Sequence, residues 1–211
     1  FHFHRLWSRR TSIRAVGSSK FAPGHRWGTF PSASIAWHMN KEDFFANMNF
    51  ISEAKLRLSY GLTGNNRIAD FGYLSQITLG VLPGYSYNNG ATSTGSQLTS
   101  MGNPELKWET TAQTNIGYDL GLFNNRVTLT ADLYKKTTRD LLLLANLPFT
   151  MGIGSAYKNV GKVQNEGLEL ALTTVNVSTK DFNWKTSFNI GFNRNKVLEL
   201  TENQQEILSP V

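Results

Sequence analysis

The stretch that most restricts the fold runs from Asn103 to Arg139, where two alternating segments flank a short polar turn. The first segment places apolar side chains at every second position: Ile116, Tyr118, Leu120 and Leu122. The second segment does the same with Val127, Leu129, Ala131 and Leu133. A period of two indicates β-strands with one apolar and one polar face. Between them, residues 123–126 (FNNR) predict a tight hairpin, because Asn tolerates the positive φ of such turns.

Both strands of this hairpin are long. Each has about ten residues or more, whereas soluble strands average about five or six. About ten residues is the length at which a tilted strand crosses a bilayer. A membrane helix is excluded by composition, since the longest purely apolar run is only Leu141 to Ala145. A long hairpin of a soluble β-sandwich remains the alternative.

The same alternation recurs along the chain. Further strands are predicted at Thr11–Val16, Thr29–Met39, Ala54–Thr63, Gly167–Val175 and Trp184–Arg194. The connections between the seven strands have about 12, 14, 39, 4, 27 and 7 residues, so long and short ones largely alternate. Long loops on one side and short turns on the other are typical of outer-membrane barrels. A sandwich gives no reason for such alternation, and the pattern therefore favours part of a membrane barrel.

The net charge of +6 is unevenly distributed. Residues 1–28 hold six Lys or Arg and no acidic residue, and the remainder is neutral. A nucleic-acid-binding protein carries a basic stripe across its folded surface, so we expect no nucleic-acid partner. The chain contains no cysteine, which excludes disulfides and cysteine-ligated metals.

The sequence carries no recognisable catalytic motif. It contains no GxSxG, HExxH, Walker or GxGxxG pattern. The four His residues, at 2, 4, 25 and 38, lie far from any nucleophile motif. We therefore expect no enzyme activity, no catalytic or metal-ligating residues and no cofactor.

Five segments together resemble a known family: RAVGSSKFAPGHRWGTFPSASIAW, AKLRLSYGLTGNN, NPELKWETTAQTNIGYDLGLFNNRVTLTADLYKKTTRDLL, NVGKVQNEGLELAL and WKTSFNIGFNRNKVLEL. In this order they are similar to the C-terminal barrel of SusC/RagA-type TonB-linked outer-membrane proteins. The resemblance covers roughly residues 11–201. Residues 1–10 do not match, so we expect an atypical segment at 1–10 and a partial TonB-dependent receptor barrel at 11–211.

The resemblance implies an all-β fold, with about seven antiparallel strands of a 22-stranded transmembrane barrel that lies in the outer membrane. It also implies uptake of glycans or peptides without covalent chemistry. The implied partners are the TonB complex, acting through a plug that this sequence lacks, a SusD-like surface lipoprotein and outer-membrane lipid. A TonB-dependent receptor for iron complexes or vitamins and a soluble β-sandwich binding module are the alternatives.

Orientation follows from the loop lengths. Long loops of such barrels lie outside the cell and short turns in the periplasm, so Gly64–Gly102 and Asp140–Glu166 are expected at the substrate mouth. Candidate substrate-binding residues are Phe71, Tyr73, Tyr85 and Tyr87. We further expect Leu58 and Leu129 to face lipid, Arg57 and Asp132 to face the lumen, and the change Arg57→Leu to be tolerated.

Overall fold

The computed structural model describes residues 6–86, 90–147, 150, 152 and 155–200. Its strands are β1 (Trp7–Gly17), β2 (Trp27–His38), β3 (Ile51–Asn65), β4 (Gln76–Ser86), β5 (Thr92–Ser100), β6 (Glu109–Leu122), β7 (Val127–Arg139), β8 (Leu142–Asn146), β9 (Ser155–Asn159), β10 (Lys162–Ser178) and β11 (Asn183–Glu199). Two short 3-10 helices, η2 (Met39–Lys41) and η3 (Asp43–Phe45), connect β2 to β3. Within the described residues, no helix has the length and apolar character required to span a bilayer.

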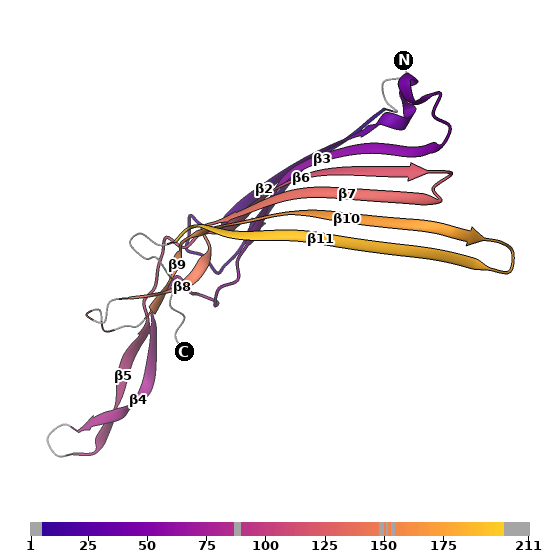
Figure 1. The fold of residues 1–211 in the computed structure, drawn as a ribbon. Helices are drawn as coiled ribbons and strands as arrows, with labels where there is room; N and C mark the ends of the chain where they lie inside the picture. Colours follow the sequence, from indigo (N-terminus) through magenta and orange to yellow (C-terminus); the bar gives the residue numbers. More distant parts are fainter. Residues whose placement is uncertain (1–5, 87–89, 148–149, 151, 153–154, 201–211) are drawn as a thin grey trace.

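One sheet of seven strands dominates the structure, in the order β1-β2-β3-β6-β7-β10-β11. Every neighbouring pair is antiparallel and follows the chain, apart from the two inserted hairpins β4–β5 and β8–β9. The strands form a continuous curved wall (Figure 1). This meander is the arrangement of an up-and-down barrel, and it confirms the predicted all-β class and the central hairpin.

Register separates an apolar from a polar face across the middle of the sheet, whereas Arg9 on β1 and the row Lys135, Glu166 and Arg194 nearer the hairpin end place charges on the apolar side. One row across the strands reads Ile35, Leu58, Ile116, Leu133, Leu168 and Phe192. The adjacent row reads Ala36, Arg57, Gly117, Asp132, Glu169 and Gly191. We call these the apolar face and the polar face. Leu58 and Leu129 lie on the apolar face, and Arg57 and Asp132 on the polar face, as the alternation predicted.

The strands extend beyond their predicted limits. β1 begins at Trp7, inside the segment 1–10 that was expected to be atypical, and four residues before the predicted strand start at Thr11. Backbone pairing of Trp7 with Trp37 and of Arg10 with Ser34 continues the ladder there. The adjacent Arg9 and Arg10 lie on opposite faces, which hides the period of two in the sequence.

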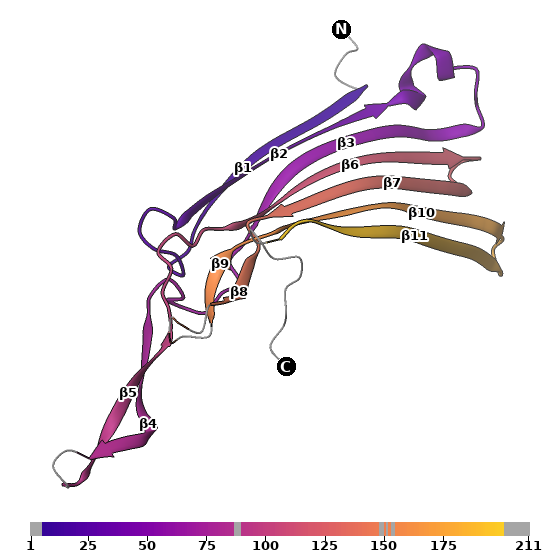
Figure 2. The same cartoon turned by 60° about the vertical axis from the view of Figure 1, so that its left-hand side comes forward.

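Both long loops contain hairpins that the sequence analysis did not predict. β4 and β5 pair within the connection expected at 64–102, and β8 and β9 within that expected at 140–166. The hairpin β4–β5 projects far from the sheet (Figures 1 and 2). A two-stranded ribbon packs no continuous apolar face against a core, so its sequence lacks the strong alternation of the main strands.

The two ends of the sheet differ. The β6–β7 and β10–β11 turns and the η2–η3 connection lie at one end, opposite both hairpins (Figures 1 and 2). In the β6–β7 turn, Phe123, Asn124 and Asn125 have φ of 54°, 56° and 61°. The Phe123 amide donates to Phe50 O at 2.8 Å, which ties the turn to the preceding connection.

The best-buried packing lies beneath the long loops. Phe21, Phe30, Ile68, Leu106, Trp108 and Leu142 form one cluster, in which Phe21 and Leu106 are fully buried. These residues come from four separate segments of the hairpin end of the sheet. The segment NPELKW (103–108) supplies Leu106 and Trp108, and the Trp108 Nε1 donates to Arg26 O at 3.1 Å. This cluster, which we call the loop anchor, fixes the base from which both hairpins project.

Candidate functional site

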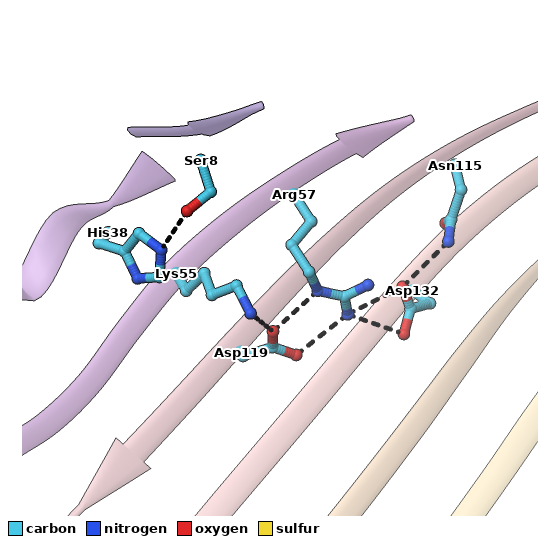
Figure 3. Close-up of polar contacts among 7 residues, drawn as sticks. All are labelled: Ser8, His38, Lys55, Arg57, Asn115, Asp119 and Asp132. Atoms are coloured by element: carbon cyan, nitrogen blue, oxygen red, sulfur yellow. Dashed lines mark hydrogen bonds and ion pairs between the residues drawn. The ribbon is translucent and has the colours of Figure 1, made fainter. Parts of the chain in front are cut away.

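Four charged side chains from three strands meet on the polar face. Arg57 on β3 lies between Asp119 on β6 and Asp132 on β7 (Figure 3). Its Nε is 2.8 Å from Asp119 Oδ2, and its Nη2 is 3.1 Å from Asp132 Oδ1. The Lys55 Nζ lies 3.7 Å from Asp119 Oδ2. Two cations thus balance two carboxylates in a half-buried network.

Strand register brings these groups together. Lys55 is directly opposite Asp119, whereas Arg57 is opposite Gly117, and Gly117 is in turn opposite Asp132. A Cβ at Gly117 would lie 2.5 Å from Arg57 Cζ and from Asp132 Oδ1. Glycine therefore leaves the space that lets the Arg57 guanidinium lie across β6 and reach β7.

A second glycine leaves space for a long side chain two strands further along the sheet. The Tyr134 ring on β7 lies over Gly167 on β10, where a Cβ would be 2.7 Å from its hydroxyl oxygen. The hydroxyl then donates to Asn193 Oδ1 on β11 at 3.3 Å. Long polar side chains thus lie flat along the polar face instead of projecting from it.

One amide side chain, Asn115, and one imidazole side chain, His38, border the charged network. The Asn115 Nδ2 donates to Asp132 Oδ1 at 3.3 Å, and its own Oδ1 is buried without a partner among the described residues. His38 Nε2 and Ser8 Oγ are 3.1 Å apart on the side toward β1. Polar groups such as His38 are thus available at the edge of the network to bind a molecule on the polar face. The prediction that Arg57→Leu is tolerated does not fit this arrangement, because that change removes the cation that pairs with Asp132 and leaves Asp119 with Lys55 alone.

A hollow of about 690 Å³ lies on the same face, over β1, β2, β3 and β6. Its floor carries small polar side chains, including Ser12, Ser32 and Ser59. Arg10 and Arg14 border it on β1, and Phe30 and Trp108 of the loop anchor also line it. This combination of cations, hydroxyls and aromatic rings suits a polar ligand with apolar parts.

The aromatic residues predicted to bind substrate differ in their surroundings where the structure describes them. Phe71 has φ 56° and is exposed beyond the end of β3, whereas Tyr73 packs against the loop anchor. Tyr85 lies near the end of β4, opposite Ser93. Tyr87 lies outside the described residues. Their contact with a ligand stays a prediction.

Sequence reasoning missed both the ion network and the hollow. A signal for the network was present, since Arg57 and Asp132 were both assigned to the lumen face of predicted strands. To predict that Arg57 pairs with Asp119 and Asp132, one must know the register between their strands, and these residues are 62 and 75 positions from Arg57 in the sequence. Alternation alone does not supply that register.

Comparison with known proteins agrees with this architecture. The family model described as "TonB dependent receptor-like, beta-barrel" matches residues 7–206. TonB-dependent receptor P39 of Formosa agariphila is 40% identical over 191 residues, which is 90% of this chain and 18% of that protein. TonB-dependent receptor SusC of Bacteroides thetaiotaomicron is 36% identical over 199 residues, which is 90% of this chain and 19% of SusC.

Solved structures give the same result. The RagAB peptide importer in its closed-closed state superposes with a TM-score of 0.85 at 30% identity, over 98% of this chain and 22% of that chain. The open-open state gives the same TM-score and identity. The chain therefore spans about a fifth of the length of the relatives that it matches. By the extent of the family match and by these identities, the chain belongs to the TonB-dependent receptor β-barrel family.

Proposed function

We propose that this chain forms part of the wall of an outer-membrane importer that takes up glycans or peptides. The observation that carries the proposal is the two-faced sheet, with an ion network on one face and exposed large apolar side chains on the other. Leu58, Leu133 and Phe192 are 47%, 55% and 57% exposed on the apolar face. In a bilayer this face meets lipid and the polar face lines a hydrated lumen.

Aromatic side chains at the short-turn end support this placement. The Trp7 and Trp37 rings stack with centroids 5.3 Å apart, and Phe50 lies 6.3 Å from Phe123. Phe44 on η3 packs edge-on against Trp37. Aromatic rings gather at the two membrane–water interfaces of outer-membrane barrels. The short-turn end therefore fits the periplasmic interface.

Two features at the opposite end support a protein cap. The segment 71–104, which contains the hairpin β4–β5, has no charged residue. Ile77 and Leu79 on β4 are 65% and 78% exposed, and Leu98 lies directly opposite Ile77. An exposed apolar row on an isolated hairpin suits contact with another protein. A SusD-like surface lipoprotein is the partner that we assign to this end, and TonB would act from the periplasm through a plug.

The cargo assignment rests on the polar face and on the relatives. The lumen side offers hydroxyl, amide and charged groups, which bind polar chains such as glycans or peptides. One structural neighbour is described as a peptide importer. No covalent step is required for such transport.

The test uses the full-length receptor in its own cells. Deletion of its gene should abolish growth on the glycan or peptide that the receptor imports, and a plasmid copy should restore it. A protonophore should stop uptake while leaving surface binding intact, because the energy comes through TonB. Loss of iron-complex or vitamin uptake, with glycan and peptide uptake unchanged, would contradict the cargo assignment.

A further inference from the structure

The hollow beside β1 carries a charge that its surroundings do not balance. Arg10 and Arg14 line it together with Ser12 on the same strand face, and no Asp or Glu among the described residues lines it. Within the described part of the chain, neither guanidinium lies within ion-pair distance of a carboxylate. Asp119 and Asp132 do not line the hollow, and they pair with Arg57 and Lys55. The hollow is therefore cationic.

Spacing restricts the ligand. Residues four apart on a strand share a face and are separated by about 13 Å. An extended peptide has the same rise, so two acidic side chains four residues apart match Arg10 and Arg14. Between the two cations, Ser12 Oγ and Ser32 Oγ are 2.8 Å apart and both line the hollow.

The floor between the two arginines suits a peptide main chain. The row that pairs with Arg10 continues through Ser34, Ser59 and Asn115, and the next row through Ser32, Gly61 and Gln113. Small side chains leave room for a backbone, and hydroxyl and amide groups can bind its N–H and C=O groups. Phe30 and Trp108 close one end of the hollow as buried parts of the loop anchor.

We propose that this hollow is a subsite on the importer wall that binds an extended acidic peptide through Arg10 and Arg14. The proposal rests on the proposed import function and adds a charge preference for the cargo. Each guanidinium forms an ion pair with one carboxylate, and the serine and glutamine side chains between them bind the peptide main chain. Similarity to a peptide importer favours a peptide over an acidic glycan.

The experiment uses the purified full-length receptor and isothermal titration calorimetry. The probe is the acetylated and amidated heptapeptide Ala-Glu-Ala-Ala-Ala-Glu-Ala, and its matched control replaces both Glu by Gln. We expect the acidic peptide to bind about tenfold more tightly at low salt, and this preference to fall as salt screens exposed charges. In the double variant Arg10→Gln, Arg14→Gln the two peptides should bind equally.

Arg9 supplies a control on the same strand. It lies opposite Ile35 on the apolar face, so Arg9→Gln removes the same charge without touching the hollow and should keep the tenfold preference. Equal binding of the two peptides to the unchanged receptor, or equal loss in Arg9→Gln, would overturn the subsite. The subsite would also be overturned if the double variant kept its preference for the acidic peptide but changed in thermal stability, because the two arginines would then pair with the plug and not with cargo.

A third probe tests the chemical class of the cargo. Oligogalacturonate carries carboxylates on a glycan, and tighter binding of it than of the acidic peptide would refute the peptide assignment. Failure of the subsite is separable from failure of the importer. If energised uptake of a neutral cargo persists while the charge preference is absent, the import function stands and the acidic subsite does not.

Discussion

Replacing Leu58 by arginine tests whether the apolar face meets lipid, because Leu58 lies at the centre of its strand. Leu58 is the central residue of β3, with seven strand residues on either side. Seven residues extend about 23 Å along a strand, or about 16 Å along the bilayer normal at a tilt of about 45°. Half the hydrocarbon thickness is about 15 Å. Leu58 therefore lies near the midplane, where the cost of a charge is largest.

The expected cost follows from that depth. An arginine on the lipid face at the midplane of a barrel destabilises it by about 2–4 kcal/mol, which corresponds to a factor of about 30 to 700 in the folding equilibrium. In the full-length receptor, Leu58→Arg should reduce the amount of heat-resistant, folded barrel recovered from the outer membrane. Flanking residues cannot relieve the cost, because Ile35 and Ile116 lie directly opposite Leu58 on its neighbours.

The neighbouring residue provides the control. Ser59 lies on the polar face and borders the hollow, so Ser59→Arg adds the same side chain to a hydrated surface. Assembly of this variant should match that of the unchanged receptor. Equal yields of folded barrel from the two variants would refute the facing assignment, as would a larger loss from Ser59→Arg.

Three further predictions concern the network, the loop anchor and the orientation. Arg57→Leu should destabilise the barrel by about 1–3 kcal/mol in urea unfolding, since it leaves the half-buried Asp132 without its cation and Asp119 with Lys55 alone. Gly117→Ala should weaken the same contacts, and the double variant should cost less than the sum of the two. Leu106→Ala should cost about 2–5 kcal/mol, because Leu106 is fully buried in the loop anchor. On intact cells, a membrane-impermeant thiol reagent should label Ser93→Cys but not Asn125→Cys.

Each of these predictions has a contradicting result. Additive effects of Arg57→Leu and Gly117→Ala would mean that the glycine does not serve the guanidinium. A loss below about 1 kcal/mol for Leu106→Ala would mean that the loops are held elsewhere. Labelling of Asn125→Cys in place of Ser93→Cys would reverse the orientation and every loop assignment with it. The chain has no native cysteine, so the introduced cysteine is the only thiol in this sequence.

The repeating properties of the fold could be predicted from the sequence. Alternation along Ala54–Thr63 and through the central hairpin gave the strands, their faces and the tight turn, because each depends on neighbours one or two positions away. The hairpin β4–β5 was missed, since its strands bury no common face against the sheet. The start of β1 was missed because Arg9 and Arg10 interrupt the pattern.

The candidate site was harder to predict, because its parts are far apart in sequence. Arg57 reaches Asp119 and Asp132 across 62 and 75 residues, and neither contact leaves a local trace. The hollow likewise needs β1 beside β2 and β3, so Arg10 and Arg14 carried no recognisable pattern by themselves. Tyr73 was chosen as a ligand contact for its place in a long loop, whereas the structure packs it against the loop anchor.

The glycine beneath Arg57 also bears on how the strands find their partners during assembly. Sliding one strand past its neighbour by two residues keeps every apolar side chain on its own face, so hydrophobicity alone leaves several alignments nearly equal in energy. Such a slip of β6 would replace Gly117 by Asn115 or Asp119 opposite Arg57, and the guanidinium would lose its path to β7. Of these alignments, only the native one places Gly117 opposite Arg57 and also lets the guanidinium reach both carboxylates. The ion network therefore favours the native register over registers shifted by two residues, which the apolar and polar faces alone would allow.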